Sequence, residues 1–428
     1  PSASPDPSAS PDASGSPDPT PTALEVARAL GVPLFADSAE LPAELDRLGT
    51  RTVITYGQVS NAGSREVIAG PATASELDLP GLPAEPPTAT TLAITNMELP
   101  AELAVVLAAG GVSTEVLRGA HPGATAETTA AVKAHEGPVV AIGDGYGTDA
   151  QFAGQVEVTR TATELPGGGI APFPGRHMIA LYGHPETAAL GMMGEQPPLE
   201  AVERLNRLVE EYRSYMPDQT VIGAFEIITT VASASAGDDG SYSYRTPVET
   251  LMPWIEAAEA NDIYIVLDLQ PGRTPFLEQA KAYEELLKRP TVGLALDPEW
   301  RLKPDQRHLR QIGQVHVDEV NEVGAWLADL VAEHKLPPKV LTLHQFQTRM
   351  VVDRVNLDTS RPEIQYLVHV DGQGGQPAKQ STWQVIQRDL PPRVFMGWKN
   401  FEDEDIPMLT PKQTVEQVKP TPFFVSYQ

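Results

Sequence analysis

The chain has 428 residues, of which 41% are hydrophobic, and its formal net charge is −26, from 31 Lys and Arg against 57 Asp and Glu. Polyanions are bound by clustered basic side chains, so this balance excludes nucleic acid as an expected partner. The chain has no apolar run of roughly 18 or more residues that could span a membrane, and no cysteine for disulfides or thiolate metal sites. We expect a soluble protein of two domains and a tail.

The chain begins with PSASPDPSASPDASGSPDPTPT, a segment rich in Pro, Ser and Asp that has no apolar periodicity. Such a composition cannot bury enough surface to offset chain entropy, so we predict a disordered tether over residues 1–22. The segment resembles the spacer that follows the lipidated cysteine of bacterial surface lipoproteins. This resemblance implies a secreted or cell-surface protein, with a lipid anchor upstream of residue 1 as its one link to a membrane. A linker remnant is the alternative.

Residues 23–169 alternate short helical patterns with short β-branched runs, which predicts a smaller α/β domain whose parallel sheet is covered on both faces. The expected helices are Ala23–Leu30, Pro42–Leu48, Ala101–Ala109 and Ala126–His135. The expected strands are Pro33–Phe35, Arg51–Tyr56, Thr91–Thr95, Val112–Leu117 and Pro138–Ile142. The glycines that follow the last strand, Gly143 and Gly145, lack the spacing of a dinucleotide-binding loop and indicate an ordinary turn.

The first part of this domain, ALEVARALGVPLFADSAELPAELDRLGTRTVITYGQVS, resembles the bacterial type 2 cell-wall-binding repeat. The matching positions are Gly31, Pro33, Leu34, Leu48, Gly49, Val53, Gly57 and Ser60. Tyr56 stands where the family usually has glycine. The resemblance covers one clear repeat and one faint one, and it implies a wall-associated, Rossmann-like module.

Residues 170–428 contain eight strand patterns separated mostly by helical ones, in a segment close to the roughly 250 residues of a (β/α)8 TIM barrel. The strands are His177–Tyr182, Val221–Thr230, Ile263–Asp268, Val292–Asp297, Val340–His344, Ile364–Val370, Val394–Trp398 and Phe423–Tyr427. The helices are Leu199–Tyr215, Val248–Ala260, Pro275–Lys288, Val317–Glu333 and Thr382–Arg388, and two connections, Met350–Thr359 and Pro411–Gln417, have room for one or two turns. A doubly wound open sheet is the alternative.

Nearly every one of these strands ends in polar residues, and in this barrel the functional groups lie at the C-terminal ends of the strands. The candidates for binding a substrate are Tyr182, His184, Gln270, Trp300, His344, Gln345, His369, Trp398, Lys399 and Tyr427. Any one of them could be a satisfied polar group of the core or rim. The whole set is harder to explain in that way, because buried polar groups without partners are costly and a barrel closes without them.

The sharpest local pattern is TVGLALDPEW, in which the period of two puts Asp297 and Glu299 on the same side of the fourth strand, the second at or just past its end. A carboxyl group beside another, or in an apolar setting such as Trp300 could provide, keeps its proton to higher pH, as a general acid must. The pattern resembles the fourth-strand motif of chitinases and barrel lysozymes. Val292 and Ala295 replace two aspartates of the chitinase motif.

This resemblance implies a glycoside hydrolase in which Glu299 is the proton donor. The partner carboxylate would be one of Asp297, Asp268, Glu226 and Asp371. The missing pair of aspartates favours a competing hypothesis, a non-catalytic barrel that binds a wall glycan or a partner protein. The C-terminal block, which includes GWKNFEDEDIPMLTP, resembles the closing strands of uncharacterised secreted barrel proteins of high-GC Gram-positive bacteria.

A metal-dependent hydrolase is the third hypothesis, because His184, His344 and His369 lie near three strand ends with Asp297 and Asp371 nearby. The first strand lacks the paired His-x-His that would strengthen it. Lys399 could form a Schiff base but is expected to pair with an acidic residue instead. We therefore expect a surface-tethered glycoside hydrolase that acts on a cell-wall or environmental polysaccharide, without a metal or other cofactor.

Overall fold

The computed structural model describes residues 21–428 except 78, 80–87 and 118. It separates into two compact units. One holds the described residues up to Ala93 together with Glu98–Thr114, and the other holds Ile94–Met97 and Glu115–Gln428. The predicted tether over 1–22 lies outside the described residues except for its last two, which open the first helix.

The first unit begins with helices α1 (Pro21–Leu30) and α2 (Leu41–Arg47), followed by strands β1 (Thr52–Thr55) and β2 (Glu66–Ala69), a 3-10 turn η1 (Ala74–Glu76) and helix α3 (Ala101–Ala109). Strands β1 and β2 pair in parallel. The prediction of a strand at Pro33–Phe35 was wrong, because Pro33 has no amide hydrogen for a ladder and Phe35 remains 37% exposed. Strand β2, only four residues long and largely exposed, was missed.

A second small sheet has the strand order β4-β3-β5, with β3 at Thr91–Thr95, β4 at Val112–Val116 and β5 at Val139–Ile142. Helices α4 (Ala126–Ala134) and α5 (Asp149–Thr161) pack against each other. Helix α5 was missed, because half of its buried residues are polar and weaken the apolar periodicity. Its start could have been found, since Thr148 and Gln151 form a capping box.

The predicted (β/α)8 barrel is confirmed. Its eight strands are β6 (His177–Gly183), β7 (Val221–Ala232), β9 (Tyr264–Leu269), β10 (Val292–Leu296), β12 (Lys339–His344), β14 (Ile364–Val370), β15 (Phe395–Asn400) and β16 (Phe424–Tyr427). Each strand is parallel to its neighbours, and β6 pairs with both β7 and β16, so the sheet closes. A short strand β8 (Ser243–Arg245) pairs antiparallel with the end of β7.

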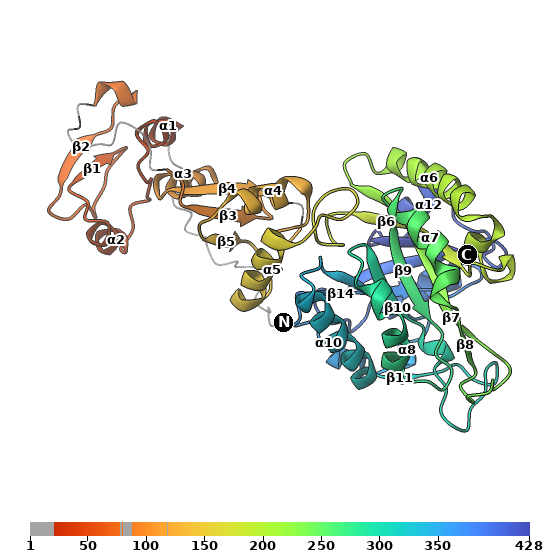
Figure 1. The fold of residues 1–428 in the computed structure, drawn as a ribbon. Helices are drawn as coiled ribbons and strands as arrows, with labels where there is room; N and C mark the ends of the chain where they lie inside the picture. Colours follow the sequence, from red (N-terminus) through yellow and green to blue (C-terminus); the bar gives the residue numbers. More distant parts are fainter. Residues whose placement is uncertain (1–20, 78, 80–87, 118) are drawn as a thin grey trace, which may run out of the picture. The chain divides into compact units, whose positions relative to one another are not determined.

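Helices surround this sheet, as Figure 1 shows for several of them. They are α6 (Pro198–Tyr215), α7 (Val248–Glu259), α8 (Phe276–Ala282), α9 (Glu284–Leu287), α10 (Val317–Glu333), α11 (Gln376–Ile386) and α12 (Pro411–Gln417). The helix predicted over Pro275–Lys288 is broken at Tyr283, whose hydroxyl lies within hydrogen-bond distance of the carbonyls of Thr229 and Thr246. Between β12 and β14 the crossover carries only the 3-10 turns η5 (Thr348–Met350) and η6 (Arg354–Asn356) and the two-residue strand β13 (Val351–Val352).

The remaining short elements are the 3-10 turns η2 (Ala188–Leu190), η3 (Met192–Glu195) and η4 (Pro298–Trp300) and the strand β11 (Val315–His316), which pairs with β13. In the part of the chain that the structure describes, no helix is both long enough and apolar enough to cross a bilayer.

The interior of the barrel is divided into an apolar and a polar part. Near the N-terminal ends of the strands the inward rows are apolar and fully buried, with Met178, Ala180, Ile222, Ala224, Tyr264, Val266, Val340, Leu367 and Phe424. Because side chains alternate along a strand, the same rows continue toward the C-terminal ends with polar residues. Those residues are Tyr182, Glu226, Asp268, His344, His369, Lys399 and Ser426.

Candidate active site

A carboxylate and two imidazoles meet at the centre of this polar end. Oε1 of Glu226, on β7, lies 3.0 Å from Nε2 of His344 on β12 and 3.3 Å from Nδ1 of His369 on β14. The two histidines are paired across adjacent strands, with ring centroids 4.8 Å apart. All three side chains are fully buried.

The other ring nitrogen of each histidine also has a partner. Nδ1 of His344 lies 3.1 Å from Oδ2 of Asp371, just past the end of β14. Nε2 of His369 lies 3.1 Å from the hydroxyl of Ser426 on β16. Both rings are therefore held at both nitrogens, which fixes their orientation.

A second group surrounds Tyr182 on β6. Its hydroxyl donates to Oδ2 of Asp268 at 2.8 Å, and the side-chain amide of Gln270 lies 3.5 Å from the same hydroxyl. Nζ of Lys399 lies over the tyrosine ring, 3.3 Å from its centroid. Lys399 thus makes a cation–π contact rather than the expected direct pairing, but its charge still favours the ionised forms of Asp371 and Glu299, whose ionisation burial opposes.

The fourth barrel strand brings two more carboxyl groups to this end. Strand β10 ends at Leu296, so Asp297 follows it directly and Glu299 lies on η4. Asp297 is buried and Glu299 is half-buried. Burial, with the nearby Glu299, raises the pKa of Asp297 well above its usual value. Burial and the charge of Asp371 raise the pKa of Glu299 to about 7.

The pKa values of the deeper groups diverge. Burial and the charge of Glu226 raise the pKa of Asp268 to about 6. Burial also opposes ionisation of Glu226, but the two imidazoles and their hydrogen bonds outweigh it and hold the pKa of that carboxyl below its usual range. In the same way, burial would lower the pKa of His344, yet the charges of Glu226 and Asp268 and the bond to Asp371 raise it well above its usual value.

Several buried carboxylate oxygens here have no hydrogen-bond partner among the described residues. They are Oε2 of Glu226, Oδ1 of Asp268, Oδ1 of Asp297 and Oδ1 of Asp371. Unpaired buried acceptors are costly, and native structures keep few of them. Four of them at one end of one barrel indicate a site whose partner is a bound molecule or ion.

Some predicted residues are placed elsewhere. Trp398 faces outward, with its ring 5.7 Å from that of Trp383 on α11, and Tyr427 faces α6, where its hydroxyl meets that of Tyr212 at 2.8 Å. Both follow from alternation, because Lys399 and Ser426, next to them in the chain, point inward. Trp383 is 1% exposed, which agrees with a packing role. We therefore remove Trp398 and Tyr427 from the candidate site.

Gln345 and His184 also leave the set. The side-chain oxygen of Gln345 accepts from Arg354, a buried residue of η6 in the crossover between β12 and β14. Nε2 of His184 is hydrogen-bonded to the hydroxyl of Thr246, and its Nδ1 accepts from the backbone N–H of Glu186. Trp300 is half-buried beside Glu299, with its ring 5.3 Å from that of His308.

Sequence reasoning missed Ser426, the partner of His369. The signal was available, because Phe424 belongs to the apolar interior and a period of two places Ser426 on the same face. The neighbouring Tyr427 was predicted as the site residue instead.

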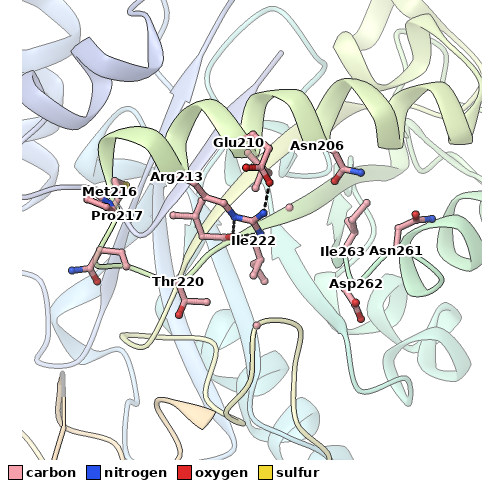
Figure 2. A pocket seen from close by; sticks show the side chains of 15 residues that line it. Asn206, Glu210, Arg213, Met216, Pro217, Thr220, Ile222, Asn261, Asp262 and Ile263 are labelled. Atoms are coloured by element: carbon pink, nitrogen blue, oxygen red, sulfur yellow. Dashed lines mark hydrogen bonds and ion pairs between the residues drawn. The ribbon is translucent and has the colours of Figure 1, made fainter. Parts of the chain in front are cut away.

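A hollow of about 680 Å3 lies at the opposite end of the barrel strands. Figure 2 shows Asn206, Glu210 and Arg213 of α6 above it, with Thr220 and Ile222 at the start of β7. Arg213 there donates to the carbonyl of Val221 and pairs with Glu210. The N-terminal face of this fold serves stability rather than chemistry, so the candidate site remains at the other end.

Comparisons with known proteins add little to this geometry. No protein-family model matches the chain, and a search of curated proteins finds no match. The resemblance of the first unit to cell-wall-binding repeats therefore has no support beyond the matching residues. One similar solved structure is a quadruple mutant of the alpha-N-acetylgalactosaminidase NagBb from Bifidobacterium bifidum, with 10% identity and a TM-score of 0.26. The match covers 53% of this chain and 43% of that one, so the chain spans less than half of that structure's length.

Proposed function

We propose that the protein is a glycoside hydrolase in which Glu299 donates a proton to the leaving glycosidic oxygen. The observation that carries the proposal is the placement of Glu299. It lies on η4 at the C-terminal end of a barrel strand, half-buried, and burial with the nearby charge of Asp371 raises its pKa to about 7. A carboxyl group with such a pKa is still partly protonated at neutral pH, as a general acid requires.

Glu299 is better placed for this role than the other carboxyl groups. Asp268 and Asp297 are buried, at 0% and 3% exposure, and Glu226 is held by two imidazoles. Glu299 is half-buried at the C-terminal end of its strand, so part of its side chain remains accessible to a substrate.

Asp371 is our choice for the second carboxylate. His344 fixes its Oδ2, and its Oδ1 has no hydrogen-bond partner among the described residues. The effect of its charge on the pKa of Glu299 supports a position near that group. It would act as the nucleophile in a retaining enzyme or as the base in an inverting one, depending on the separation of the two carboxyl groups.

The groups around this pair suit a sugar. The unpaired Oδ1 of Asp371 can accept a hydrogen bond from a hydroxyl group, Gln270 and Tyr182 add polar atoms, and Trp300 offers an aromatic face. We propose a cell-wall or environmental polysaccharide as the substrate and an extracellular or cell-surface location. The support for both is the resemblance of residues 23–60 to wall-binding repeats and of residues 1–22 to lipoprotein spacers.

Glu299→Gln tests the proposal, because it keeps the size of the side chain and removes the proton. We expect kcat on soluble and wall polysaccharides, measured as released reducing ends, to fall by about 10²–10⁴-fold, the contribution typical of general acids. Glu278→Gln is the control, since Glu278 is exposed and pairs with Arg245. Turnover that Glu299→Gln leaves unchanged would end the assignment.

A barrel that binds glycans without hydrolysing them is the second candidate function. It is favoured by Val292 and Ala295, which stand where the chitinase motif has aspartates. Binding on a glycan array with no product released from any bound glycan would support it over the hydrolase.

A further inference from the structure

We propose that Glu226, His344, His369 and Asp268 form a site for one divalent transition-metal ion inside the polar end of the barrel. One possible ligand atom from each of the first three residues lies within 4.8 Å of the other two. These residues come from three different barrel strands, β7, β12 and β14. The site does not depend on the proposed hydrolase activity.

The distances suit a shared ion. Oε1 of Glu226 lies 3.0 Å from Nε2 of His344 and 3.3 Å from Nδ1 of His369, and Oδ1 of Asp268 lies 3.8 Å from the same Nε2. Ligands of a tetrahedral zinc ion, at roughly 2.0–2.2 Å from the metal, are separated from one another by about 3.3 Å. Glu226, His344 and His369 thus already lie close to the spacing that coordination would impose, and Asp268 would complete the set by a small approach.

The outer contacts of both histidines are those of metal ligands. His344 faces Asp371 with Nδ1, and His369 faces Ser426 with Nε2, each at 3.1 Å. If these nitrogens carry the ring protons, the two nitrogens that face Glu226 have free lone pairs. A carboxylate or hydroxyl that accepts from the far nitrogen of a ligating histidine is the usual way to fix its tautomer.

A second observation points to a cation. Oε2 of Glu226 and Oδ1 of Asp268 have no hydrogen-bond partner among the described residues, and both side chains are 0% exposed. A protonated His344 between Glu226 and Asp371 would account for the hydrogen bonds without a metal, but it leaves these two oxygens unpaired. A bound ion would compensate both carboxylates, which burial otherwise penalises.

The donor set selects the kind of ion. Two imidazoles with two carboxylates suit Zn²⁺ and its first-row neighbours, whereas Ca²⁺ and Mg²⁺ prefer oxygen ligands alone. The structure therefore favours Zn²⁺ or Co²⁺ as a probe over Ca²⁺.

The test uses the full chain, stripped with EDTA and titrated with Zn²⁺ by calorimetry and with Co²⁺ by visible absorption, without substrate. We expect one ion per chain and, in Glu226→Gln and His369→Gln, an affinity at least 100-fold weaker. His177→Gln is the matched control, because His177 is a buried histidine of the same barrel that contacts the Pro422 carbonyl at the other end. Its affinity should equal that of the natural chain.

Asp371→Asn is a further variant to test. Its metal affinity should be about 10–100-fold weaker, the effect typical of removing a residue that bonds a metal ligand. Near-UV circular dichroism and the unfolding midpoint of each metal-free variant identify any variant that fails to fold. The affinities of the folded variants then test the metal site. Absence of binding by the natural chain, or unchanged affinity in the folded variants, would overturn the metal site. Failure of the hydrolase proposal would leave this result untouched, because no turnover is measured.

Discussion

Five carboxyl groups share the polar end of the barrel, and each has a different balance of burial and neighbours. Glu226 and Asp371 contact imidazole nitrogens and have lowered pKa values, although burial works in the opposite direction. Asp268, Asp297 and Glu299 have raised pKa values, with burial as the largest cause. Groups whose environments push their pKa values apart are suited to opposite acid and base roles.

Under the proposed hydrolase function, the raised pKa of Glu299 predicts how the reaction rate depends on pH. A general acid works only while protonated, so kcat/KM should fall about tenfold per pH unit above its pKa of about 7. The residual activity of Glu299→Gln should lack this basic limb, while Glu278→Gln should keep it. The measurement is a pH–rate profile of the natural chain and both variants. The same limb in Glu299→Gln would mean that another group titrates.

Asp297 should reduce stability at neutral pH. Its pKa is raised in the folded chain, so the folded state keeps a proton that the unfolded state has already lost above its usual pKa of 3.8. Stability therefore falls as pH rises from about that value through the higher folded-state pKa. Asp297→Asn should raise the free energy of unfolding at pH 7 by about 1–3 kcal/mol, the order of the desolvation penalty of a buried polar group, because an amide does not ionise in either state.

Urea denaturation of EDTA-treated protein at pH 5 and pH 7 would measure this. The gain should be larger at pH 7, because the folded chain keeps a proton on Asp297 that the unfolded chain has released, and the free-energy cost of keeping it grows as pH rises. Asp305→Asn, at an exposed position, should change neither value. A variant less stable than the natural chain at pH 7 would contradict the prediction.

At the scale of elements, helix α11 is attached to the barrel by a buried ion pair. Nζ of Lys379 lies 2.6 Å from Oδ2 of Asp405 and donates to the carbonyl of Lys399 on β15 at 2.8 Å. The same ammonium lies over the rings of Trp398 and Phe401. These contacts join α11, β15 and the loop that follows β15.

Lys379→Met should cost about 3–5 kcal/mol of unfolding free energy, because it leaves the charge of Asp405 buried without its partner. Adding Asp405→Asn should recover part of the loss, since it removes the buried charge and its amide oxygen can still accept from one of the two backbone N–H groups, of Gly374 or Phe401, that now bond the two carboxylate oxygens. Denaturant unfolding of both variants provides the comparison. A cost of Lys379→Met below about 1 kcal/mol, the value of an exposed pair, would show that the pair is not effectively buried.

At the scale of the whole molecule, the two units divide the chain unequally. A fragment of residues 90–428 removes α1, α2, β1, β2 and η1 but keeps every strand of the barrel and all three strands of the β4-β3-β5 sheet. We expect it to unfold cooperatively, with the midpoint of the full chain's barrel transition, and to keep full turnover of small soluble substrates. Calorimetry and kinetics of both proteins test this. A lower midpoint or lost cooperativity would show that the barrel needs the missing segment.

The barrel could be predicted from local patterns, because each of its strands and most of its helices carry their own periodicity. Helix α10 was predicted with the bounds that it has, and β14 likewise. Prediction failed where the pattern is short or polar, as at β2 and α5, or where an apolar run contains proline, as at Pro33. Local pattern therefore suffices for long amphipathic elements and not for short ones.

Which strand-end residues meet could not be predicted in this way, because it depends on the closed sheet. Glu226 lies 118 positions before His344 and 143 before His369, and no local pattern links them until the sheet closes. In the closed sheet, successive side chains of a strand also point to opposite faces. Lys399 and Ser426 therefore enter the interior, while Trp398 and Tyr427 pack against helices. The sequence could indicate that the strand ends are polar. The contacts among them depend on strand order and register, which long-range pairing alone sets.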